Sequence, residues 1–298
     1  MLPIWLVLYI LVIIPYALYY KLLTDQSQTG NTNPLIGLAL VGIMLAAFLV
    51  SFFIIKLTIE SIKWRDNQIR FDGKFPAYIG KILLGFLLSI ITLTIYMAWF
   101  IRDITRFFIN NSSVDSAHFQ FKGKGGKLFV ILLLAMFLPI ILLTLILGKQ
   151  LVAQNQSFWF SIVYQGILMI VLIPYFYFTY KWMVDIKFKE YHISWQTNFG
   201  NSFVKIFIEI FLTLITCGIY MPLAYLKLYK YFSEKTVAES ENVSLRFGYD
   251  LDSVNDFLFI WGQMLLSIVS VGIYYPWAFS KIGKRVFNKT YVIKTNAA

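Results

Sequence analysis

The sequence contains few charged residues. Asp, Glu, Lys and Arg together make up 14% of the 298 residues, whereas apolar residues make up 59%. Soluble domains carry about 25% charged residues, so this chain lacks the polar surface that a water-facing globule needs. The composition excludes an ordinary soluble domain and predicts a membrane protein.

Residues that carry chemistry are also scarce. The chain has one cysteine, Cys217, and two histidines, His118 and His192, which excludes a disulfide framework and leaves no metal-ligand set. No nucleophile–base pair or paired carboxylates can be assembled, so we expect no catalysis and no cofactor. The net charge of +11 fits the positive-inside rule, and the expected partners are the bilayer and its anionic headgroups rather than nucleic acid. A protein partner or a homo-oligomer stays open.

Long apolar runs are abundant. Each is about 20 residues long, which suffices to cross a bilayer, and they lie at residues 2–20, 35–55, 79–101, 128–148, 158–180, 203–226 and 257–279. Four connecting segments alternate apolar and polar residues, at 62–73, 114–123, 187–200 and 243–248. Such alternation is typical of short, half-buried strands, which we expect outside the hydrocarbon because lipid cannot satisfy open strand edges.

The chain also repeats itself. The motif Ile95-Tyr96-Met97 recurs as Ile219-Tyr220-Met221 and again at residues 273–275, and Lys81 corresponds to Lys205. We infer a first repeat unit at residues 1–127, a second at 128–250 and a third, partial module at 251–298. The predicted fold is an all-α polytopic membrane protein with internal duplication, in which short cytoplasmic strand or hairpin segments lie between the helices.

Several of these residues resemble the hallmark of the YjgN-like family. Gly-Ile-Tyr-x-Pro occurs at residues 218–222 and 272–276, and Phe-x-Gly occurs at 71–73 and 121–123. The resemblance covers residues 68–292 and implies a bacterial inner-membrane protein with a repeat architecture and no established activity. The first module departs from the pattern, with Thr94 for Gly and Ala98 for Pro, so we expect a straighter helix there.

Two topologies are open. Seven alternating spans divide the basic residues almost evenly between the two sides, and the few apolar residues between Tyr96 and Arg102 suit the interfacial end of a full span. If the three Ile-Tyr runs are instead broken helices that return to their own side, only Lys21 and Lys149 of the 26 basic residues face outward. We favour this second, multi-pass arrangement, with four spans and with both termini in the cytoplasm.

Three sets of residues are candidate sites. The first centres on Glu209, the one acidic residue inside a long apolar run, with Gln263 at the corresponding place in the third module. An intramembrane acid is a functional candidate, but Lys205 lies one helical turn earlier, so a structural ion pair is the alternative.

The second set consists of helix breaks. Glycine followed four residues later by proline predicts an interrupted helix with exposed backbone groups, which transporters use as binding sites. These residues are Gly218, Tyr220, Pro222, Gly272, Tyr274 and Pro276, and we expect Tyr220, Tyr274 and Thr216 to line a central cavity. Kinks packed against neighbouring helices are the alternative.

The third set alternates cations with aromatic residues after each Ile-Tyr motif. This pattern suits an amphipathic helix at an anionic lipid surface, although a simple topology anchor explains it equally well. The predicted headgroup contacts are Arg102, Arg106, Lys227, Lys230, Lys281, Lys284 and Arg285. Together the features favour membrane transport, a pore or lipid handling, and the alternative is a membrane-anchored scaffold whose strands dock a partner.

Overall fold

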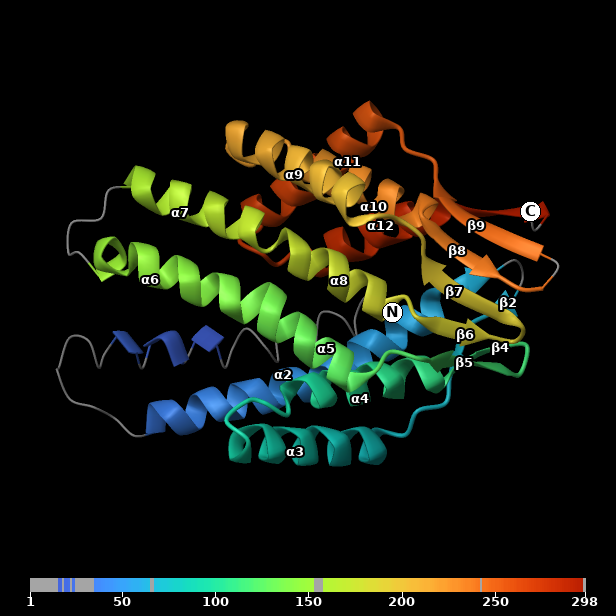
Figure 1. The fold of residues 1–298 in the computed structure, drawn as a ribbon, viewed down its shortest axis with the longest axis horizontal. Helices are drawn as coiled ribbons and strands as arrows, with labels where there is room; N and C mark the ends of the chain where they lie inside the picture. The colour runs from blue at the N-terminus through green and yellow to red at the C-terminus, as the bar shows by residue number, and fades with distance from the viewer. Residues whose placement is uncertain are drawn as a thin grey trace.

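The computed structural model describes residues 35–64, 67–152, 158–241 and 243–296, with a few positions between 16 and 24. The span predicted at residues 2–20 lies almost entirely outside this part of the chain. In the described part, strands gather at one end and helices extend from it, as Figure 1 shows with the strands at the right.

Eight strands form one antiparallel sheet, and their order across the sheet is their order in the sequence. They are β3 (Arg70–Phe71), β4 (Ser112–Val114), β5 (Ala117–Phe121), β6 (Ile186–Phe188), β7 (Tyr191–Trp195), β8 (Thr236–Glu239), β9 (Val243–Tyr249) and β10 (Thr290–Asn296). A separate two-stranded pair, β1 (Lys63–Trp64) and β2 (Asn67–Gln68), precedes them.

The predicted all-α polytopic class is therefore wrong. The four alternating segments do contain strands, but β8 and β10 lie outside them and complete a sheet that no single segment reveals. Among the described residues, one helix, Gly125–Leu147, is long and apolar enough to cross a membrane, or two if a pair bent by 42° counts as one span. The three Ile-Tyr runs fall short because each divides into two shorter helices.

A helical pair is inserted between each of four pairs of neighbouring strands. The first is α3 (Phe75–Ile91) with α4 (Met97–Asn110), between β3 and β4. The third and fourth are α9 (Phe199–Ile215) with α10 (Met221–Glu234), between β7 and β8, and α11 (Ser253–Val269) with α12 (Tyr275–Asn288), between β9 and β10. We call α3 with α4 the first hairpin, α9 with α10 the second hairpin, and α11 with α12 the third hairpin.

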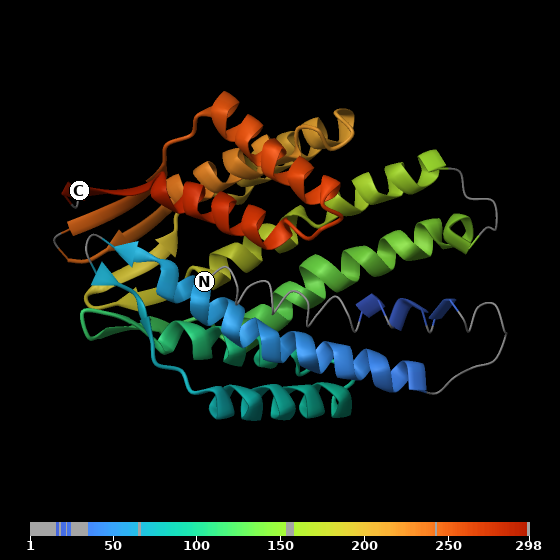
Figure 2. The same ribbon diagram turned by 180° about the vertical axis from the view of Figure 1, so that it is seen from behind.

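Longer helices fill the remaining insertion, between β5 and β6. One leg runs through α5 (Gly125–Ile131), a π-helical turn η1 (Leu132–Phe137) and α6 (Leu138–Val152), and the other through α7 (Phe158–Val171) and α8 (Ile173–Met183). Pro139 follows the π-helical turn and lacks an N–H, which accounts for the disturbed hydrogen-bond ladder before it. These legs and α2 (Leu35–Ser61) reach farther from the sheet than the hairpins do (Figures 1 and 2).

The three hairpins turn back instead of continuing. Their first helices have 17 residues each, about 25 Å, which is shorter than a full span. The three Ile-Tyr runs are thus interrupted helices in this structure, and their return to the side of the membrane from which they entered stays a prediction. The division into repeat units at residues 1–127, 128–250 and 251–298 is untested and stays a prediction.

Buried aromatic residues join the helices to the sheet. The strand before each helical pair ends in Phe71, Phe121, Trp195 or Tyr249, and none of these side chains is more than 6% exposed. Glycine follows two residues after the two phenylalanines, and a Cβ on Gly73 or Gly123 would collide with the preceding Phe ring. The Phe-x-Gly motif is thus a packing motif that lets the ring fold back over the backbone.

Candidate functional site

A chain of polar side chains links the two helices of the second hairpin. Glu209 is 2% exposed and accepts hydrogen bonds from Lys205 Nζ at 2.6 Å and from the Tyr220 hydroxyl at 2.8 Å. Lys227 Nζ donates to the Tyr220 hydroxyl at 2.9 Å. The Lys205–Glu209 ion pair expected from the sequence is present, and Tyr220 carries the contact across to α10.

The third hairpin repeats this chain without the acid. Tyr274 donates to Gln263 Oε1 at 2.9 Å, and Lys281 Nζ donates to the Tyr274 hydroxyl at 2.8 Å. The lysine also lies over the tyrosine ring, at 5.5 Å here and at 5.3 Å for Lys227 over Tyr220. In both hairpins a neutral or charged oxygen on the first helix therefore serves the same tyrosine–lysine pair.

The first hairpin has apolar packing at the equivalent place. Gly85 leaves room for the ring of Phe100, which a Cβ would strike, and Tyr96 stacks on Trp99 with ring centroids 6.3 Å apart. Arg102 pairs with the adjacent Asp103 at 2.7 Å. Three helical pairs of one shape thus present an acid, an amide or no polar group at one depth.

The turns of the three hairpins share one backbone conformation. Positive φ angles occur at Leu93 and Thr94 (48° and 71°), at Cys217 and Gly218 (50° and 86°), and at Val271 and Gly272 (51° and 85°). The expectation that the first module runs straight is therefore wrong. Two successive residues in the left-handed conformation reverse the chain. Glycine at the second position is not required for this turn, but it lowers the conformational strain of the positive φ angle.

The turns do not expose their backbone amides as expected. The hydroxyls of Thr92, Thr216 and Ser270 accept hydrogen bonds from the N–H groups of Tyr96, Tyr220 and Tyr274, at 2.9, 3.1 and 2.9 Å. Gly218 N–H donates to the Thr213 carbonyl at 2.8 Å. Pro222 and Pro276 are buried in the first turns of α10 and α12, where proline fits without breaking a helix.

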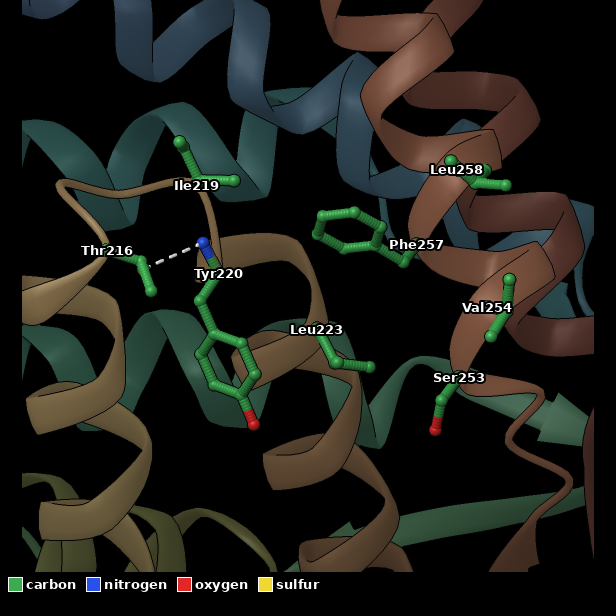
Figure 3. Close-up of a pocket in the computed structure, with 8 residues that line it drawn as sticks. All are labelled: Thr216, Ile219, Tyr220, Leu223, Ser253, Val254, Phe257 and Leu258. Atoms are coloured by element: carbon green, nitrogen blue, oxygen red, sulfur yellow. Dashed lines mark hydrogen bonds between the residues drawn. The ribbon is translucent and has the colours of Figure 1, made fainter.

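An apolar groove of about 310 Å³ lies between the second and third hairpins. In Figure 3 the ring of Phe257 projects from α11 toward the tip of the second hairpin, where Thr216, Ile219 and Tyr220 lie. Leu223, Ser253, Val254 and Leu258 complete the lining. Thr216 and Tyr220 line this groove. Tyr274 does not line it and instead donates to Gln263, so the central cavity expected for all three residues stays a prediction.

A second groove, of about 600 Å³, is basic. It lies between α11 and α12 and is lined by Phe259, Gln263, Lys281, Lys284, Arg285, Asn288 and Lys289. The other predicted headgroup contacts are dispersed: Arg106 is exposed on α4, and Lys230 lies near Glu234 at 3.7 Å on α10. We call this second groove the basic groove.

Asp256 lies beside the basic groove and was missed by the sequence analysis. Its side chain is 1% exposed and accepts hydrogen bonds from Arg285 Nε at 2.7 Å and from Lys289 Nζ at 2.8 Å. Burial raises the pKa of this carboxyl, but the hydrogen bonds from Lys289 and Arg285 outweigh burial and hold the pKa below its usual value. Asp256 directly precedes the apolar run, and its partners Arg285 and Lys289 lie 29 and 33 residues later, so no local pattern in the sequence signals the contact.

Comparisons with known proteins agree with the prediction that this is a membrane protein. A family model described as a bacterial protein of unknown function (DUF898) matches residues 66–246. The inner membrane protein YjgN of Salmonella typhimurium is 37% identical over 88 residues, which cover 28% of this chain and 22% of that protein. This chain therefore aligns with less than a quarter of that relative's length. No solved structure matches the chain.

Proposed function

Because the chain belongs to the YjgN-like family of bacterial inner-membrane proteins (DUF898), we propose that it binds and moves lipids in that membrane without covalent chemistry of its own. The sheet would lie on the cytoplasmic side, together with both termini. The long helices would cross the bilayer, and the three hairpins would enter it from the cytoplasm and turn back.

The distribution of apolar and basic residues supports this arrangement. The hairpin tips expose large apolar side chains, with Leu93 85% and Val271 90% exposed. Such tips are stable only in lipid or against a partner. Among the described residues, the basic ones in the connections at the end away from the sheet are Lys21, before α2, and Lys149, near the end of α6, which fits the positive-inside rule.

The observation that carries the proposal is the apolar groove between the second and third hairpins. Its lining combines Leu223, Phe257 and Leu258 with the tyrosine of a polar chain. A groove that is apolar and open beside lipid-facing tips fits an acyl chain better than a soluble solute. The polar chain from Lys205 to Lys227 would then meet the polar part of the same molecule.

A lipid-movement assay tests the proposal. Purified protein is reconstituted into liposomes that contain a lipid with a fluorescent headgroup, and loss of fluorescence is followed after a membrane-impermeant reductant is added. We expect complete loss of fluorescence with the wild-type protein. Leu223→Trp fills the groove and should return the signal to that of protein-free liposomes.

Leu93→Trp is the matched control. It makes a similar change of size at the exposed tip of the first hairpin, away from the groove, and should retain lipid movement. Wild-type protein that moves no lipid, or equal loss in both variants, would contradict the proposal.

The scaffold alternative has one structural observation in its favour. β10 is a seven-residue strand at the edge of the sheet, paired on one side with β9. An exposed edge of that length can accept a strand from another protein. This alternative predicts no lipid movement by the purified protein.

A further inference from the structure

The basic groove of the third hairpin carries a net positive charge, because the one carboxylate that pairs with its cations, Asp256, serves only Arg285 and Lys289. Four cations line it, three on α12 and Lys289 directly after that helix, and its lining includes no carboxylate. In the second hairpin Glu209 balances Lys205 and lies near Lys227, but the corresponding Gln263 is neutral. Lys281 therefore has only the Tyr274 hydroxyl as its partner within the described residues.

Part of the groove is fixed in position before any ligand binds. The Arg285 guanidinium lies 4.5 Å from the centre of the Phe259 ring, and its Nε is held by Asp256. Lys289 is held by both oxygens of the same carboxylate, at 2.8 and 2.9 Å. A guanidinium that is stacked and anchored loses little entropy on binding an anion.

Other donors in the groove are available to a ligand. In the described part of the chain, nothing accepts a hydrogen bond from the two Nη groups of Arg285 or from Lys284 Nζ. The paired N–H groups of arginine match two oxygens of a phosphate, and lysine adds a point charge. The donor set therefore suits a phosphate better than a single carboxylate.

The position of the groove along the hairpin suits a lipid headgroup. The tip of the third hairpin is apolar, with Val269 80% and Ile273 66% exposed. Lys281 lies six residues into α12, about 9 Å from its start, and Lys289 follows at the sheet end. The groove thus lies between the apolar tip and the sheet end of the hairpin. Figure 2 shows the two helices of this hairpin, in orange-red and red, extending from the sheet.

We propose that the basic groove binds the phosphate of an anionic lipid headgroup, with Lys281, Lys284 and the Nη edge of Arg285 as its contacts. Asp256 acts as a positioning residue that orients Arg285 and Lys289. This inference rests on the proposed function and names the class of lipid that the protein handles.

Binding to nanodiscs of defined composition tests the site. The full-length protein, in nanodiscs of phosphatidylcholine, is titrated with phosphatidylglycerol, and bound lipid is counted by native mass spectrometry. Removing one hydrogen bond to a charged group costs about 1.5–3 kcal/mol, so Lys284→Ala should weaken binding at least about tenfold. Lys230→Ala is the matched control, because it removes one cation at the corresponding position of the second hairpin and should leave the affinity unchanged.

The outcomes separate the alternatives. Equal weakening by Lys284→Ala and Lys230→Ala would overturn the site in favour of general electrostatic attraction. Arg285→Lys keeps the charge and loses the paired donors, so unchanged affinity in that variant would also contradict the proposal. Binding of glycerol 1-phosphate is measured with the protein in detergent that contains no phospholipid. If this soluble phosphate binds and the binding depends on Lys284 in the same way, the assignment to a lipid is overturned.

The lipid-movement assay stays independent of this test. Protein that binds phosphatidylglycerol through Lys284 but moves no lipid supports the site and contradicts only the proposed function. Protein that moves lipid without a phosphatidylglycerol preference contradicts only the site.

Discussion

Glu209 and Gln263 occupy equivalent places and accept a hydrogen bond from a tyrosine at the start of the returning helix. Because Gln263 supports the same tyrosine–lysine pair without a charge, the third hairpin serves as an internal control for the second. An oxygen acceptor, rather than an acid, is what the tyrosine–lysine pair of these two hairpins uses. A negative charge at Glu209 therefore adds either stability through Lys205 or a role in the activity.

Substitution of Glu209 separates these roles. Glu209→Gln keeps an acceptor for Tyr220 and should lower the free energy of unfolding by less than about 1.5 kcal/mol. Glu209→Ala leaves the Tyr220 hydroxyl and Lys205 without an acceptor and should cost about 2–3 kcal/mol. Thermal unfolding in detergent measures both. Equal losses in the two variants would show that the charge itself stabilises the hairpin.

Asp256 gives the third hairpin a dependence on pH. Because the folded-state pKa lies below the unfolded value, the stabilisation is present above about pH 4 and is lost as the pH falls through the folded pKa. Asp256→Asn should remove it at neutral pH, at a cost of about 2–3 kcal/mol, since Arg285 and Lys289 stay partly exposed. Unfolding temperatures of the wild-type protein and of Asp256→Asn, measured at several pH values, test this prediction. A difference between them that does not narrow in acid would contradict it.

At the scale of the element, the turns show how a motif can mislead. Gly-x-x-x-Pro suggested a break caused by both residues, yet the first hairpin reverses with Thr94 and Ala98 in those positions. The shared cause is local: two left-handed residues, and a hydroxyl that accepts the tyrosine N–H. The hydroxyl position was visible in the sequence, but its capping role depends on a backbone conformation that single residues do not reveal.

The turn of the first hairpin stores strain that glycine relieves. Thr94 has a φ of 71°, which is costly for a β-branched residue. Thr94→Gly should stabilise the protein by about 1 kcal/mol, a rise in melting temperature of about 2 °C or more. The converse control is Gly218→Thr, where a Cβ meets nothing within 4 Å, so its destabilisation reports backbone strain alone. A loss of stability in Thr94→Gly would rule out this explanation.

For the whole molecule, the sequence predicted part of the strands and the interruptions of the three Ile-Tyr runs, but it misjudged the fold class. Alternation identified short strands because half-buried segments keep a period of two. It did not reveal all eight strands of the sheet, since strands such as β3 and β4 have two and three residues and pair across long helical insertions. The basic groove was foreseen only as separate cations, because its assembly requires Asp256 and Phe259 from the neighbouring helix.

The side of the membrane on which the connections lie can be measured directly. Ser116 lies in the turn between β4 and β5, and Glu241 in the turn between β8 and β9. With Cys217 replaced by serine, Ser116→Cys and Glu241→Cys should both react with an impermeant maleimide from the cytoplasmic side alone, because one sheet holds both turns. Labelling from opposite sides would establish seven alternating spans.

The sheet has a consequence for how the protein is made. Since every strand pairs with the next strand in the sequence, each newly synthesised strand meets an edge that already exists. A ribosome at the membrane can therefore deliver one helical pair, close it with a strand and move to the next, without threading any segment through an earlier one. Biogenesis would proceed as a series of additions to a growing edge, and a chain that stalls after β8 would already hold a continuous six-stranded sheet, from β3 to β8.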